Sequence, residues 1–174
     1  HPALLDEVGS VADRLPRNMA SRVRQVLARL HDAADRTQRN LESLLTDIEI
    51  LLNEHAGRSG RYGSRLRITD ELRHTSGWEN LSALWSQLAP RFDDLVDGLS
   101  QLGDGLEDLA DVEAPELESA RVRLLGATRT LATANRQLEQ FIKSPDDNGI
   151  YWLETRYRGP VTVNAVPLHV GPLV

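Results

Sequence analysis

Three long stretches of the chain repeat apolar residues at steps of three and four, and this feature restricts the fold more than any other. The stretches are residues 18–56, 78–109 and 117–141. Such spacing places the apolar side chains on one face of an α-helix, as in the seam of a coiled coil. At 1.5 Å per residue, these helices would be roughly 40 to 60 Å long. The repeats predict an all-α fold, an elongated antiparallel coiled-coil-like bundle of three long helices.

The end of the chain has a different pattern, typical of β-strands. Residues 150–157 alternate, which places Tyr151 and Leu153 on one face of a strand and Trp152 and Glu154 on the other. A turn at 158–159 then leads to a second strand from residue 161. Because a two-stranded hairpin is only marginally stable alone, we expect both strands to belong to a sheet that this segment does not contain. The short C-terminal β segment predicts two regions, a helical domain at 1–144 and the β segment at 145–174.

The composition excludes several classes of protein. The chain has no cysteine, so neither disulfides nor thiolate metal sites stabilise it, and its formal net charge of −6 argues against a protein that is basic overall. No apolar run approaches the ~20 residues that span a bilayer, and the first residues lack the pattern of a signal peptide. We therefore expect a soluble, cytoplasmic protein with no membrane partner. Because His1 is not an initiator methionine, we expect the segment to come from a longer chain.

The second helical stretch carries most of the acidic residues. Residues 76–113 contain nine acidic side chains and Arg91 as the single basic one. The acidic residues between positions 93 and 111 could suggest a metal site or an acid/base site. They occupy the outward positions of the repeat, so we interpret them as a solvated face. The seams contain no acid, which disfavours a helical-bundle enzyme with inward carboxylates. The histidines have no metal-ligand spacing, so we predict no metal site and no catalytic residue.

Aromatic residues in the same stretch have two interpretations. Trp78 and Trp85 could stack on nucleic-acid bases, but they lie seven residues apart within the apolar seam. That position favours burial in the core.

Residues 58–75 form a basic stretch that contrasts with the acidic helix after it. Arginine can contact phosphate through two hydrogen bonds at once, and a tyrosine between glycines could stack on a base. The alternative is that the arginines only make an exposed loop soluble, or that they form ion pairs with acidic residues of a neighbouring helix. The candidate DNA-binding residues are Arg58, Arg61, Tyr62, Arg65, Arg67 and Arg73.

The order of these features resembles a known family. A helical insertion followed by "IYWLE" and then by "VPLHVGPLV" is similar to DinG-type DNA helicases, relatives of the XPD helicase in superfamily 2. In that family, a helical arch domain interrupts the first motor domain between the DEAH box and the Ser-Ala-Thr motif. Residues 68–72 and Trp78 also resemble the arch pattern of a basic, strand-like piece before a Trp-led helix. The match rests on Tyr151, Trp152, Leu153, Glu154, Pro167, Leu168, Val170 and Leu173.

The resemblance implies a function for the segment. Residues 1–144 would be the arch and residues 145–174 part of the first motor domain of an ATP-dependent 5′ to 3′ DNA helicase. The arch would help to retain single-stranded DNA in a channel. Its partners would be single-stranded DNA and the remaining motor domains of the same parent chain.

The segment itself lacks the motifs of the motor. Neither G-x-x-x-x-G-K-[ST] nor Asp-Glu-Ala-His occurs, so ATP and Mg²⁺ would be cofactors of the parent, and we expect no cofactor and no ATP hydrolysis in this segment alone. The alternative function is a free-standing coiled-coil adaptor or scaffold, whose seams bind partner helices.

Overall fold

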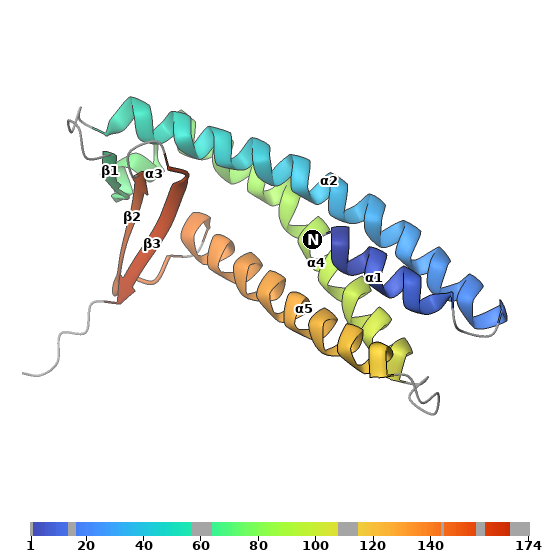
Figure 1. Cartoon of the computed structure of the whole chain (residues 1–174). Helices are drawn as coiled ribbons and strands as arrows, with labels where there is room; N and C mark the ends of the chain where they lie inside the picture. The colour runs from blue at the N-terminus through green and yellow to red at the C-terminus, as the bar shows by residue number, and fades with distance from the viewer. Residues whose placement is uncertain are drawn as a thin grey trace, which may run out of the picture. The chain divides into compact units, whose positions relative to one another are not determined.

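The computed structural model describes residues 2–13, 17–56, 64–107, 115–143, 145–155 and 159–167 (Figure 1). These residues form five helices and three strands, and most of them are helical. In chain order the elements are α1 (Pro2–Ala12), α2 (Arg17–His55), β1 (Ser64–Arg67), α3 (Asp70–Arg73), α4 (Ser76–Glu107), α5 (Pro115–Ile142), β2 (Gly149–Thr155) and β3 (Val161–Pro167).

The three long helices of the sequence prediction are α2, α4 and α5, but three is too small a count for the described residues. The short α1 precedes them, and a single helical turn, α3, lies between β1 and α4. Thr69 caps α3, since its side chain accepts a hydrogen bond from the backbone N–H of Leu72 (3.3 Å). The elongated shape, the coiled-coil supercoil and the boundary at 144/145 stay predictions.

Burial confirms the seam of α4 over its described length. The apolar side chains at steps of three and four are each 5% exposed or less: Trp78, Leu81, Trp85, Leu88, Phe92, Leu95, Leu99, Leu102 and Leu106. Trp78 and Trp85 are therefore core residues, as the spacing predicted. Pro90 lies inside α4 without ending it. Leu109 and the connection to α5 lie outside the described residues.

The helices contribute to two compact units. The first unit contains residues 1–39 and 89–135, and the second contains residues 40–88 and 136–174. In the first unit, α1 packs with the first part of α2, the second part of α4 and the first part of α5. Their shared core is Leu4, Leu5, Val8, Ala12, Ala20, Leu27, Leu30, Leu95, Leu99, Leu102, Leu106, Leu117, Ala120 and Leu124.

The second unit has an aromatic core that joins helices to the sheet. The ring of Phe141 lies 5.5 Å from that of Trp78 and 6.2 Å from that of Tyr151, between ring centroids. The indole Nε1 of Trp85 donates a hydrogen bond to the carboxylate of Glu139. These contacts place side chains of α4, α5 and β2 in one core.

The sheet corrects the expectation that the final strands have no partner in this chain. It is antiparallel with the order β1-β2-β3, so β2 is central (Figure 1). The register pairs Arg67 with Trp152 across β1 and β2, and the N–H of Ile68 continues the pairing with a bond to the Tyr151 carbonyl (2.9 Å). The strand from the basic stretch supplies the third member that a two-stranded hairpin needs for stability.

The first turn of α5 carries an ion pair that should respond to acid. Arg121 donates to the Glu118 carboxylate through Nε (3.0 Å) and Nη2 (3.2 Å), and this hydrogen bonding lowers the pKa of Glu118 from its ordinary value. The contribution of the pair to stability is thus complete above the unfolded-state pKa and is lost as the pH falls through the lower folded-state pKa.

We expect the variant Glu118→Gln to melt slightly below the wild type at neutral pH. The difference in Tm should shrink progressively as the pH falls from 4.5, the ordinary pKa of a glutamate, through the lower pKa of folded Glu118, because the protonated Glu118 side chain is uncharged, as glutamine is. Melts followed by circular dichroism from neutral to acidic pH measure this difference. A difference that stays constant over the whole range would contradict the role of the pair.

Candidate nucleic-acid interface

The sheet has one face that packs on the core and one that does not. Leu153 and Tyr151 point to the packed face and are 0% and 6% exposed. Because side chains alternate along a strand, their neighbours Trp152 and Glu154 belong to the opposite face, which we call the outer face. The alternation predicted from the sequence is confirmed from residue 150 to residue 155.

The register brings side chains from all three strands together on the outer face. Arg65 pairs with Glu154 and Arg67 with Trp152, and on the other side Trp152 pairs with Asn164. Directly paired residues of antiparallel strands share a face. The outer face is therefore formed by Arg65, Arg67, Ile150, Trp152, Glu154, Thr162, Asn164 and Val166.

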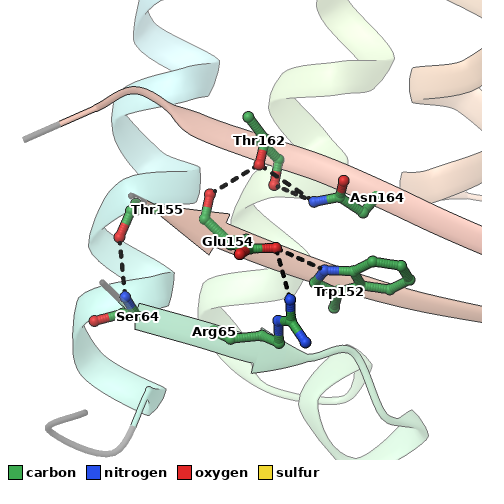
Figure 2. Close-up of polar contacts among 7 residues, drawn as sticks. All are labelled: Ser64, Arg65, Trp152, Glu154, Thr155, Thr162 and Asn164. Atoms are coloured by element: carbon green, nitrogen blue, oxygen red, sulfur yellow. Dashed lines mark hydrogen bonds and ion pairs between the residues drawn. The ribbon is translucent and has the colours of Figure 1, made fainter. Parts of the chain in front are cut away.

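Glu154 lies at the centre of a polar cluster on this face, and Trp152 is one of the residues that bond to it (Figure 2). The guanidinium carbon of Arg65 is 5.6 Å from the indole centroid, within the range of a cation–π contact. Arg65 Nη2 and Trp152 Nε1 both donate to Glu154 Oε2, at 3.0 and 3.2 Å. The carboxylate thus holds the indole and one guanidinium in fixed positions.

Strand β3 adds hydrogen-bonding groups beside the indole. Asn164 Nδ2 donates to the carbonyl (3.3 Å) and the hydroxyl (3.2 Å) of Thr162, while the Thr162 hydroxyl donates to the Glu154 carbonyl (3.1 Å; Figure 2). The bond from Thr162 to Glu154 links β3 to β2 on the side of the face away from β1, and the two bonds of Asn164 lie within β3.

Arg67 is the available cation of the outer face. Its side chain is exposed, and it makes no ion pair or hydrogen bond with any residue that the structure describes. Arg65 is also largely exposed, at 65%, although Glu154 neutralises part of its charge. Two arginines against one glutamate leave this face with a positive charge.

The six predicted DNA-binding residues do not form one group. Arg65 and Arg67 lie side by side with Trp152 on the outer face. Arg73 instead lies in α3, where its Nη1 donates to the carbonyls of Phe141 (3.0 Å) and Ile142 (3.3 Å) at the end of α5. Arg58, Arg61 and Tyr62 lie outside the described residues.

The surroundings of Arg73 are those of a structural residue. Its guanidinium carbon lies 4.7 Å from the Trp78 ring centroid and 5.8 Å from that of Tyr151. Burial disfavours the charged form and lowers the pKa of Arg73 from its ordinary value. The side chain stabilises the end of α5, so phosphate contact by Arg73 stays a prediction without support from this position.

Sequence reasoning missed Trp152 and Asn164 as members of the candidate site. The available signal was the alternation in residues 150–155, which already placed Trp152 on the face away from Tyr151. Arg67 pairs with Trp152 although the two residues lie far apart in the sequence. Only the register of β1 on β2 shows it.

An indole beside two arginines of the neighbouring strand suits the binding of an unpaired nucleic-acid strand. Aromatic side chains stack on exposed bases, and arginines contact the backbone phosphates. Within the described residues, no three His, Cys, Asp or Glu side chains are grouped so that they could hold a metal ion. The candidate chemistry of this face is binding.

Comparison of the chain with protein-family models, with curated proteins and with solved structures finds no match. Among the described helices, none combines the length and the apolar character that crossing a membrane requires.

Proposed function

We propose that the outer face of the sheet binds single-stranded DNA, and that the chain is the arch-domain segment of a DinG/XPD-type DNA helicase. In this role it helps to retain the strand in a channel during 5′ to 3′ translocation. The observation that carries the proposal is the position of Arg65, Arg67 and Trp152 on one exposed face. The resemblance of residues 151–154 and 167–173 to the helicase family supports the second part.

A single strand offers bases for stacking and phosphates for ionic contact, and different residues of the outer face would bind each. Trp152 provides a ring for one base, and Arg67 provides a guanidinium with no internal partner among the described residues. Stacking depends little on base identity, so binding should have little sequence preference. Because the whole chain has a net charge of −6, we expect modest affinity, and the salt dependence should be shallow because few phosphates are neutralised.

The test measures binding of a labelled oligothymidine to the chain by fluorescence anisotropy at several salt concentrations. We expect Trp152→Ala to weaken binding about 5-fold or more, since stacking of one base contributes about 1 to 3 kcal/mol. The double variant Arg65→Gln/Arg67→Gln should reduce the log–log salt slope by up to about 1.4, or about 0.7 for each phosphate that the variant no longer neutralises.

A matched control removes the same charge elsewhere. Arg22→Gln/Arg39→Gln changes two exposed arginines of α2 and should leave the affinity close to that of the wild type. Equal weakening by the two double variants would show a general charge effect and would count against the outer face. Unchanged affinity in Trp152→Ala would rule out stacking on this indole.

The family assignment has a test of its own. Translation of the open reading frame on both sides should show a DEAH box upstream and a Ser-Ala-Thr motif downstream. Their absence, together with retained DNA binding, would separate the outer face from the helicase assignment.

A specific observation supports the adaptor as a second candidate. Val26 and Leu45 flank the apolar seam of α2. They are 36% and 39% exposed, whereas Leu52, which also flanks the seam, is fully buried. Exposed apolar residues beside a seam are what a partner helix would cover. A chain that binds no single strand would favour this function.

A further inference from the structure

A pocket of about 220 Å³ lies between α2 and α4 in the first unit, and no residue of the outer face lines it. It is lined by Arg29, Ala33, Arg36, Thr37, Arg91 and Asp94. The α2 residues recur at helical spacing and share a face, on which the small side chain of Ala33 leaves space between the longer ones.

The charges around this pocket are mostly positive. Three arginines face one aspartate, and Arg36 is paired with Asp32 through Nη2 and Oδ2 (2.7 Å). Arg29 and Arg91 are exposed, and neither makes an ion pair or hydrogen bond with a described residue. Although the whole chain has a net charge of −6, two such arginines make this pocket locally positive, which favours the binding of an anion.

One buried group in the lining of the pocket, the hydroxyl of Thr37, has no hydrogen-bond partner among the described residues. Thr37 is 4% exposed and is the one buried polar residue among those that the structure describes. Its hydroxyl oxygen is buried and has no partner there. Other helical hydroxyls of this chain bond to the carbonyl four residues earlier, as Thr46 does to Glu42 (2.9 Å) and Thr128 to Leu124 (2.8 Å). Thr37 does not satisfy its hydroxyl in this way.

We infer that this pocket binds a phosphate group. A phosphate has enough oxygens to accept hydrogen bonds from Arg29 and Arg91 and from the Thr37 hydroxyl after rotation of that side chain. Arginine suits such an anion because its planar guanidinium donates two bonds in a fixed geometry. Asp94, which also lines the pocket, can accept a hydrogen bond from a hydroxyl group on the remainder of the ligand. This inference does not depend on DNA binding by the sheet.

Two sources could supply the phosphate, a small phosphomonoester or the phosphodiester backbone of a nucleic acid. They differ in charge, since a monoester approaches two negative charges at neutral pH and a diester carries one. Inorganic phosphate and dimethyl phosphate are probes for the two forms. Arg29 and Arg91, which have no partner among the described residues, match the dianion, so we expect inorganic phosphate to bind more tightly.

The experiment is a titration of the whole chain with each probe at constant ionic strength, followed by calorimetry and by the rise in Tm. Ligand binding to the folded state raises Tm in a concentration-dependent way. We expect saturable binding of inorganic phosphate, weakened about 10-fold or more by Arg29→Gln/Arg91→Gln. The control Arg22→Gln/Arg39→Gln should bind as the wild type does.

A second variant keeps the inference testable if the arginine variant folds poorly. Thr37→Val has the same shape but no hydroxyl, so it should raise the Tm of the chain without phosphate and weaken phosphate binding several-fold. Tighter binding of dimethyl phosphate would assign the site to a nucleic-acid backbone. Absence of saturable binding by either probe, or equal affinity in wild type and both pocket variants, would overturn the inference.

Discussion

Replacement of Trp85 by alanine should lower the free energy of unfolding by about 3 to 5 kcal/mol, the usual effect of removing a large aromatic side chain from a core. The Trp85 side chain is 0% exposed, and its Nε1 donates to Glu139. The variant would lose the burial of the ring and leave a cavity. It would also leave the Glu139 carboxylate without this donor. Urea unfolding followed by circular dichroism measures the change without depending on tryptophan fluorescence.

Trp152→Ala is the matched control because it removes the same side chain from the outer face. Trp152 is half-buried, and its contacts are with Arg65 and Glu154. We expect it to destabilise the chain by no more than about 1 kcal/mol, as for a substitution outside the core. Similar losses in the two variants would mean that the outer face is part of the core. A small loss makes Trp152→Ala a clean variant for DNA binding.

The core around Trp85 could be predicted because its pattern is local. A residue every three or four positions on one helix identifies the buried face without knowledge of what covers it. His55 is an exception, because it continues the spacing of the α2 seam in sequence but is exposed in the structure. It is the last residue of α2, so the packing that covers the seam does not extend to it.

Strand β1 could not be predicted with the same security. It has four residues, two of them arginines, and no local pattern longer than two alternations. Its pairing with β2 joins residues about ninety positions apart, such as Arg65 and Glu154. Sequence reasoning placed the basic, strand-like piece at residues 68–72, but the strand lies before it at Ser64–Arg67, and residues 70–72 belong to the helical turn α3. It also assigned the missing partner strands to another part of a parent chain.

The candidate site was predicted in part for the same reason. A surplus of arginine in residues 58–75 is visible in the sequence, but whether each one is exposed depends on the element that contains it. Arg65 and Arg67 lie two residues apart on β1 and therefore share its exposed face, whereas Arg73 lies in the helical turn that Thr69 caps. A threonine followed by two acidic residues is a signal for a helix start, and it could have separated Arg73 from the other arginines.

Arg73→Ala should lower the free energy of unfolding by about 2 to 4 kcal/mol, which makes it the test of this separation. Hydrogen bonds that involve a charged group contribute about 1.5 to 3 kcal/mol, and a cation–π contact adds about 0.5 to 2. The variant would remove both bonds to the α5 carbonyls and the contact with Trp78 at 4.7 Å. Urea unfolding again gives the measurement.

The comparison with Arg67→Ala and Arg73→Lys distinguishes a structural role from a role in binding. Arg67→Ala should change stability by less than about 0.5 kcal/mol, because its side chain is exposed. Arg73→Lys keeps the charge but not the planar fork, so its stability should lie between those of Arg73→Ala and the wild type. If Arg73→Lys folds as stably as the wild type while its DNA affinity falls, Arg73 belongs with Arg65 and Arg67 in the binding site. Loss of stability with unchanged DNA affinity at temperatures where the variant is folded assigns Arg73 to the end of α5.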